Sequence, residues 1–100
     1  MNADQYHLCK IAEECTEVAQ RALKAQQFGL GEVQPGQDQS NLERLVDEFH
    51  DLYSTLHNFA DLIGFDLIPS KEKHLARIAK MDKFLRLSVS LNQTDETTTI

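Results

Sequence analysis

The sequence predicts an all-α fold, an antiparallel helix bundle of three main helices per chain that is completed by oligomerisation. Apolar residues recur every three or four positions in three long segments. Capping residues precede these segments, and glycine or proline separates them. A chain of 100 residues, 41% of them hydrophobic, forms one small domain that buries only a modest part of its surface alone. Pairing its apolar stripes with those of other copies is therefore favoured.

The first helix is expected from Asn2 to Phe28. Asn2 is a suitable N-cap, and Gln5 stands three residues later, where a capping box reaches back. Gly29 is a natural left-handed stop, and Leu30 is available to pack against the last turn. The apolar spacing between these ends fits a helix.

The second helix follows a loop at residues 31–39, which is rich in glycine, proline and polar residues. This flexible loop is either a spacer or, beside a ligand site, a lid. Ser40 and Glu43 form the next capping box, and Gly64 ends the second helix.

The third helix is expected after Pro69, with Ser70 as its cap. We assign residues 1–87 to the helical domain. Residues 88–100 are too polar to pack well and are expected to form a flexible tail.

Composition narrows the function classes. The net charge of −6 argues against general binding to nucleic acid or an anionic membrane, although a bound divalent metal would still admit a phosphate ligand. No stretch reaches the roughly 18 apolar residues of a membrane span, and the first residues do not resemble a signal peptide. Cys9 and Cys15 are poorly spaced for a disulfide within one helix, so we expect reduced, core or near-core residues in a cytoplasmic protein.

Two acidic pairs carry the functional signal. Glu14 and Glu17 share one face of the first helix, and Glu48 and Asp51 share one face of the second. Each pair borders an apolar stripe, where crowded carboxylates repel, lose hydration and need a cation or protons. Counted from the loop, the pairs differ in height by only about 5 Å, so the four acids can face one another. Oxygen ligands of this kind favour Mg²⁺ or Mn²⁺, whereas the alternative is two ordinary solvated helix faces.

The order of these acids resembles the MazG-like superfamily of all-α nucleoside triphosphate pyrophosphohydrolases. The family signature, EExxE followed after a loop by ExxD, is met by Glu13, Glu14 and Glu17 and then by Glu48 and Asp51. The resemblance implies hydrolysis of a (d)NTP to the nucleoside monophosphate and pyrophosphate by a dimer or tetramer. The spacer between the two motifs is long for the family.

The resemblance also implies roles for individual acids. Mg²⁺ would be held by Glu14, Glu17, Glu48 and Asp51. Glu13 lies off their face, so it orients water, contacts a neighbouring subunit or belongs to the surface.

Basic residues are candidates for binding the triphosphate. Lys10 and Arg21 lie one turn before and one turn after the first acidic pair, where they either meet phosphate oxygens or form (i, i+4) salt bridges. The third helix has a basic side, either solvated or directed at the triphosphate as in the family, and from it we select Lys80 and Lys83.

Other polar and aromatic residues suggest a base pocket. His57 and Asn58 lie two turns beyond Asp51 and are candidates to border it. Phe49 and Tyr53 either stack on the base or, as members of the apolar stripe, belong to the core.

Three alternatives to the hydrolase remain. Asp47 and His50 have the carboxylate–histidine spacing of di-iron bundles, but the two Glu-x-x-His pairs that those proteins need are missing from the sequence. A non-catalytic helical oligomerisation or adaptor module would leave the acids solvated or bridged to lysines. A sensor would bind a nucleotide or alarmone without turning it over.

Overall fold

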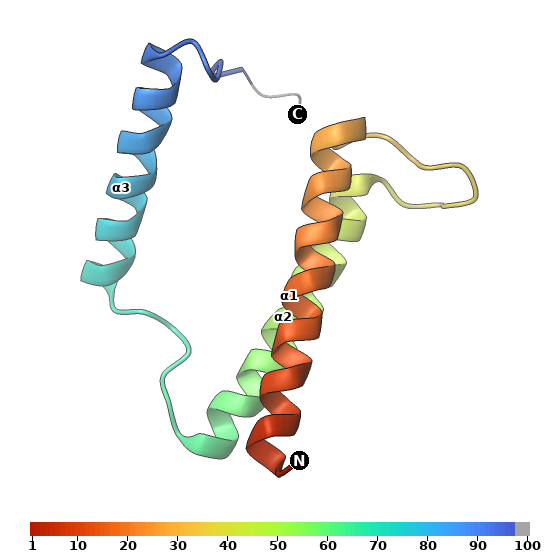
Figure 1. The fold of residues 1–100 in the computed structure, drawn as a ribbon, viewed down its shortest axis with the longest axis vertical. Helices are drawn as coiled ribbons and strands as arrows, with labels where there is room; N and C mark the ends of the chain where they lie inside the picture. Colours follow the sequence, from red (N-terminus) through yellow and green to blue (C-terminus); the bar gives the residue numbers. More distant parts are fainter. Residues whose placement is uncertain (98–100) are drawn as a thin grey trace. The chain divides into compact units, whose positions relative to one another are not determined.

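The computed structural model describes residues 1–97, and these residues contain helices but no strand. The helices are α1 (Ala3–Phe28), α2 (Asn41–Ile63) and α3 (Lys71–Ser90) (Figure 1). The all-α prediction is therefore confirmed for this part of the chain. Two compact units are present, one formed by Met1–Phe65 with α1 and α2, the other beginning at Asp66 and containing α3. Within residues 1–97, no helix has the length and apolar character needed to cross a membrane.

Both capping boxes form where the sequence predicts them. Asn2 Oδ1 accepts from the Gln5 backbone N–H at 2.9 Å, and Gln5 Oε1 accepts from the Asn2 backbone N–H at 2.8 Å. Ser40 Oγ accepts from the Glu43 backbone N–H at 3.2 Å, and Glu43 Oε1 accepts in return at 3.1 Å. Each box satisfies backbone donors that the first turn of a helix leaves free, which fixes the starts of α1 and α2.

The two helix-ending glycines differ. Gly64 has φ 78° and ψ 42°, the left-handed conformation expected of a helix stop. Gly29 has φ 99° but ψ 147°, so the predicted left-handed stop is wrong at this position. The extended ψ directs the chain into the loop, where Leu30 C=O accepts from the Leu42 backbone N–H at 3.0 Å. Only glycine adopts such a backbone readily.

Asn41 closes the base of the loop. Its side chain is only 3% exposed, and Nδ2 donates to Gly29 C=O at 2.8 Å and to Glu32 Oε1 at 3.2 Å. Its backbone N–H donates to Glu32 C=O at 2.9 Å. These bonds form a clasp, defined here as Gly29, Glu32 and Asn41, that ties the end of α1 to the start of α2.

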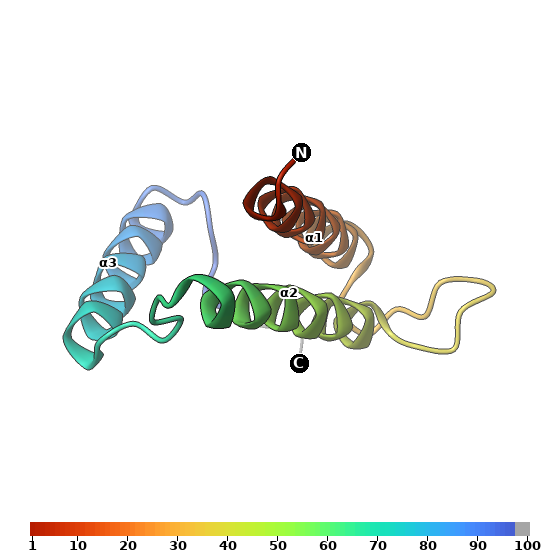
Figure 2. The same cartoon turned by 90° about the horizontal axis from the view of Figure 1, so that it is seen from below.

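The helices α1 and α2 pack side by side in one unit, and the chain runs in opposite directions along them (Figures 1 and 2). Contacts at both ends agree, because the ring of His7 lies 5.8 Å from that of Phe59 while Asn41 contacts Gly29. Among residues 1–97, the buried apolar core is small and consists of Ala25, Phe59 and Ala60. This reversal brings the middle of α1 against the middle of α2.

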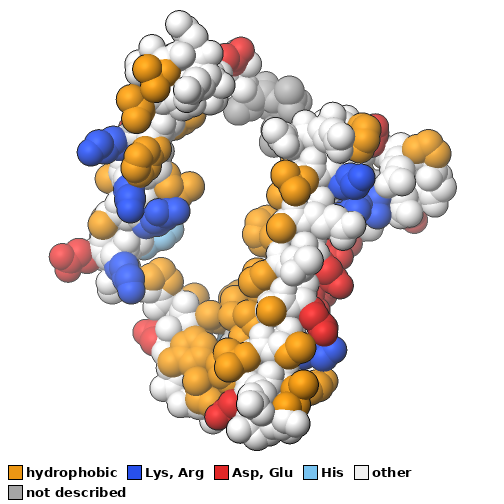
Figure 3. Space-filling model, in the orientation of Figure 1, with side chains coloured by type: hydrophobic (Ala, Val, Ile, Leu, Met, Phe, Trp, Pro, Cys, Tyr) orange, Lys and Arg blue, Asp and Glu red, His pale blue; other side chains and the backbone are white. Residues whose placement is uncertain are grey.

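Much of the predicted apolar stripe lies at the surface. Phe49 is 50% exposed and Tyr53 is 53% exposed, so of their two predicted roles the core position does not hold within the single chain. Cys9 and Cys15 are free thiols at exposed positions, which also corrects their core assignment. Two helices can cover only the seam between them, and the remaining apolar side chains stay uncovered, as Figure 3 shows for one face. Completion of a bundle by other copies remains a prediction.

The third helix begins as predicted, because Ser70 Oγ accepts from the Lys73 backbone N–H at 3.2 Å. It ends at Ser90 and so extends beyond residue 88, where the tail was expected to begin. None of its residues is buried. Residues 98–100 of the predicted tail lie outside the described residues.

Candidate metal centre

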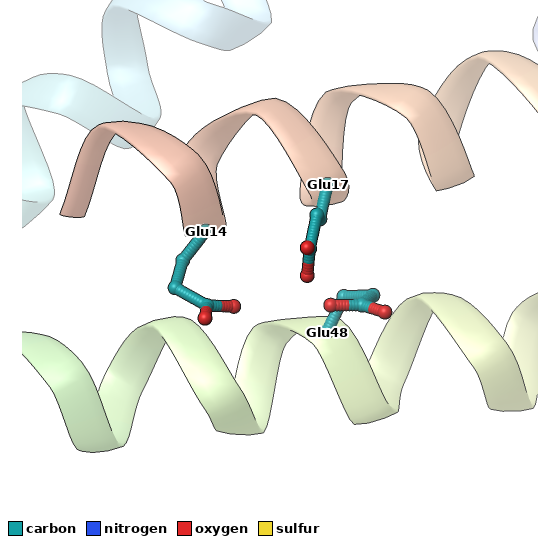
Figure 4. Close-up of side chains that lie close together, drawn as sticks. All are labelled: Glu14, Glu17 and Glu48. Carbon is teal, nitrogen blue, oxygen red and sulfur yellow. The ribbon is translucent and has the colours of Figure 1, made fainter. Parts of the chain in front are cut away.

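Three of the four predicted acids converge between α1 and α2. Glu14 and Glu17 extend from α1 and Glu48 extends from α2, and their carboxylates point toward one another (Figure 4). One carboxylate oxygen from each residue lies within 4.8 Å of the others. Helical spacing puts the two α1 acids on one face, and the reversal of the chain at the loop sets Glu48 opposite them.

Asp51 does not belong to this group. Its side chain is exposed, and it is absent from the mutual 4.8 Å set found among the described residues. Aspartate is one methylene shorter than glutamate, so from one turn past Glu48 it reaches less far across the seam. Its charge still acts on the group, because it contributes to raising the pKa of both Glu14 and Glu48. The predicted set of four is thus three converging carboxylates with a fourth nearby, and the role of Asp51 as a ligand stays a prediction.

Holding the carboxylates of Glu14, Glu17 and Glu48 together as anions, without a cation between them, is electrostatically unfavourable. Burial raises the pKa of Glu14, and repulsion from Glu17 and Asp51 raises it further. Burial also raises the pKa of Glu48, followed by the close approach of Glu17. Atom Oε2 of Glu14 and Oε2 of Glu48 are buried without a hydrogen-bond partner among residues 1–97. Buried acceptors of this kind call for a proton or a cation.

A hard divalent cation fits these residues. Glu14, Glu17 and Glu48 supply only oxygen ligands, which suit Mg²⁺ or Mn²⁺ better than softer metals. Mg²⁺ is commonly held by one or two carboxylates together with water and the phosphates of a substrate. The two buried, unpartnered oxygens are the structural reason to expect a cation here.

A cleft of about 360 Å³ adjoins the acids on the side nearer the loop. Its lining includes Glu17, Arg21, Gln39, Arg44, Asp47 and Glu48. Arg21 was predicted, and the structure places it beside the acids. Sequence reasoning missed Arg44, although it precedes Glu48 by one turn just as Arg21 follows Glu17 by one turn. Counting residues from the loop along each helix, as was done for the acids, would have placed the two arginines near each other.

Glu13 and Lys10 lie outside the converging group and bind each other. Lys10 Nζ lies 3.1 Å from Glu13 Oε2, and both side chains are about half exposed. This hydrogen bond raises the pKa of Lys10. Lys10 therefore forms an (i, i+3) ion pair with Glu13 and not the anticipated (i, i+4) bridge to Glu14. Any role of this pair toward water or substrate stays a prediction.

The predicted base-pocket residues lie in a different depression. His57 and Asn58 line an open pocket of about 310 Å³ together with Tyr53 and Asp61. His57 Nδ1 lies 3.3 Å from Asp61 Oδ2, so its contact is to a neighbouring turn of α2. None of the residues that line this pocket lines the cleft beside the acids.

The remaining basic and histidine candidates are exposed. Lys80 and Lys83 lie on α3, in the second unit, and their role in binding a triphosphate stays a prediction. His50 is exposed on α2 and does not belong to the converging acidic group.

Comparison of the chain with protein-family models, with curated proteins and with solved structures gave no match.

Proposed function

We propose that this protein is a Mg²⁺-dependent nucleotide pyrophosphohydrolase that converts a (d)NTP to the (d)NMP and pyrophosphate. Its role would be to clear non-standard or excess nucleotides. The observation that carries the proposal is the convergence of Glu14, Glu17 and Glu48 from two helices, with two buried oxygens that have no partner among the described residues. The resemblance of the acidic motifs to the MazG-like family supports the same reaction.

The chemistry requires few groups. Water attacks the α-phosphorus and loses a proton to solvent, the bond from that phosphorus to the oxygen bridging the β-phosphate breaks, and pyrophosphate leaves. Phosphoryl chemistry depends on positioning and charge neutralisation more than on covalent catalysis. A bound Mg²⁺ supplies the charge neutralisation and lowers the pKa of a water ligand. Glu14, Glu17 and Glu48 would hold the ion, and the nearby charge of Asp51 would increase the negative potential at the site.

Assembly belongs to the same proposal. Side chains such as Phe49 and Tyr53 are about half exposed in the single chain, which favours a homo-oligomer, a dimer or a tetramer. In that assembly the three helices of each chain would complete an antiparallel bundle with those of other copies. The net charge of −6 argues against a nucleic acid or an anionic membrane as the partner, and the free thiols of Cys9 and Cys15 fit a cytoplasmic protein.

Pyrophosphate release tests the reaction directly. Purified protein is incubated with each (d)NTP and Mg²⁺, and released pyrophosphate is quantified. The proposal expects release from at least one nucleotide and its loss in Glu48→Gln. Glu72→Gln is the control, because it removes an acid from the first turn of α3 and leaves the converging group intact. Absence of release from every nucleotide would refute the hydrolase.

A second candidate is a non-catalytic oligomerisation or adaptor module. It is favoured by α3, which has no buried residue and carries half-exposed apolar side chains such as Ile78, Met81 and Phe84. Calorimetric titration with Mg²⁺ or Mn²⁺ separates the two candidates. If the protein is a hydrolase, it should bind the metal saturably, and Glu14→Gln should abolish that binding. If it is an adaptor, no saturable metal binding that depends on Glu14 should be seen. A nucleotide sensor would bind metal and nucleotide but release no pyrophosphate.

A further inference from the structure

Two arginines lie at the end of the cleft that is nearer the loop. Arg21 follows Glu17 by one turn on α1, and Arg44 precedes Glu48 by one turn on α2. The two glutamates lie at the same height, and the helices run in opposite directions. The step from Glu17 to Arg21 and the step from Glu48 to Arg44 therefore both lead toward the loop. The arginines are therefore displaced from the acids by about 6 Å along the helix axes. Both line the 360 Å³ cleft.

The guanidinium groups of Arg21 and Arg44 have few acceptors among the described residues. Nη1 of Arg21 is buried and has no hydrogen-bond partner among the described residues. In the same part of the chain, neither Arg21 nor Arg44 forms an ion pair, although Glu17 and Glu48 line the cleft with them. A guanidinium stays charged and carries five donors, and a buried donor left without an acceptor is costly. An acceptor from outside the chain would satisfy it.

The side-chain amides of two loop glutamines form hydrogen bonds with residues that line the cleft. Arg44 Nη1 donates to Gln34 Oε1 at 3.0 Å, so this bond pairs the guanidinium with a neutral acceptor and not with a carboxylate. Gln39 Nε2 donates to Asp47 Oδ2 at 3.1 Å and so satisfies one oxygen of an acid that lines the cleft with Arg44. The loop therefore leaves the charge and remaining donors of Arg44 available to a ligand.

We propose that Arg21 and Arg44 form an anion site for the terminal phosphates of a metal-bound polyphosphate. The cation of such a ligand faces the acids, and its outer phosphate oxygens face the arginines one turn away. Guanidinium groups suit this role because their planar fork binds phosphate oxygens in pairs. The inference rests on the proposed function and deepens it, since it orients the departing pyrophosphate toward the loop and adds Arg44 to the substrate-binding residues.

The test uses inorganic tripolyphosphate, which has no base or sugar. Calorimetric titration in the presence of Mg²⁺ gives the Kd for the full-length protein and its variants. Arg21→Gln and Arg44→Gln should each weaken binding by about tenfold or more, as loss of a charged hydrogen bond does. Arg44→Lys keeps the charge but not the fork and should fall between wild type and Arg44→Gln.

Lys24→Gln is the matched control. It removes one positive charge from α1 near Arg21, but Lys24 lines a separate pocket and lies over the ring of Phe28. Its Kd should stay within about twofold of wild type, because an exposed charge outside the cleft acts only through screened solvent. Thermal unfolding of each variant shows that the fold is retained. If Arg44→Gln does not fold, Arg21→Gln and Arg44→Lys provide the measurement.

The outcomes separate the anion site from the hydrolase. The inference is overturned if wild-type protein does not bind tripolyphosphate, or if the arginine variants lose no more affinity than Lys24→Gln. Arginine-dependent binding without pyrophosphate release from any nucleotide supports the anion site and refutes the reaction. Nucleotide hydrolysis with a KM unchanged in Arg21→Gln and Arg44→Gln supports the reaction and overturns the anion site.

Discussion

Glu17 on α1 and Glu48 on α2 face each other across the helix pair, each with a carboxylate oxygen within 4.8 Å of the other. One turn toward the loop, Arg21 and Arg44 line the same cleft. The sign of the charge thus reverses within a single turn. A ligand that combines a cation with an anionic chain matches this sequence of charges, whereas a simple anion or a simple cation matches only half of it.

Replacing Glu17 by Gln should weaken Mg²⁺ or Mn²⁺ binding by at least about tenfold. Losing a residue that only hydrogen-bonds to a metal ligand already costs about that much affinity. Glu17 supplies one of the three converging oxygens, and an amide is a weaker, neutral ligand. Calorimetric titration with each metal gives the affinities. The matched variant is Glu13→Gln, which removes the ion pair to Lys10 and leaves the converging group intact. Equal affinities for the two variants would contradict a site at Glu17.

In the metal-free protein, ionisation of Glu14 and Glu48 should lower the free energy of unfolding as the pH rises. Both pKa values are raised above the ordinary value of 4.5, so the folded state binds these protons more tightly than the unfolded state does. The resulting stabilisation is complete below pH 4.5 and is lost as the pH rises through the raised pKa values. Glu48→Gln imitates the protonated side chain. Its Tm should therefore exceed that of wild type at pH 7, with the difference shrinking toward pH 4.

Saturating Mg²⁺ at pH 7 is the control for this pH effect. Ion binding stabilises the folded state more strongly when the ion binds more tightly, so wild type should gain more than Glu48→Gln. Thermal melts across pH, with and without metal, measure both differences. A Tm difference that grows as the pH falls would show that burial and the neighbouring acids do not raise these two pKa values.

Asn41→Ala should lower the free energy of unfolding by about 1–3 kcal/mol, the usual cost of leaving buried polar groups unpaired. The buried amide donates to Gly29 C=O and Glu32 Oε1, and alanine can do neither. Urea denaturation measures the change. Gln37→Ala, at an exposed position of the same loop, should stay within about 0.5 kcal/mol of wild type. A similarly small effect at Asn41 would mean that the clasp contributes little to stability.

Phe49→Glu should shift the protein toward the monomer. Phe49 is 50% exposed on a helix face, and a charge there would oppose burial against another copy. Sedimentation analysis over a range of concentrations gives the association state. Val33→Glu is the matched control, since Val33 is 49% exposed but lies in the loop. Wild-type protein that remains monomeric at all concentrations would remove the basis for a bundle completed by other copies.

Local signals in the sequence predicted the helices well. The capping boxes at Asn2 and Ser40 and the glycine stop at Gly64 depend on neighbouring residues, so they can be read from short stretches. The convergence of Glu14 with Glu48 followed from counting residues on both sides of the loop. Those parts of the prediction needed only the regular rise of a helix.

What the sequence did not predict depends on contacts between segments. The burial of Asn41 and the hydrogen bond from Arg44 to Gln34 arise from the path of the loop, which has no regular repeat. The exposure of Phe49 was missed because periodicity marks an apolar stripe without showing how much of it one partner helix covers. The extended backbone at Gly29 likewise depends on where the loop must go next.

The clasp of Gly29, Glu32 and Asn41 lies at the root of the loop, away from its tip at Pro35 and Gly36. The alignment of the two helices is thus set before the chain enters the tip. Extra residues grafted there leave the register of Glu14 against Glu48 unchanged. The tip is the natural place to attach a fluorophore or a fusion partner.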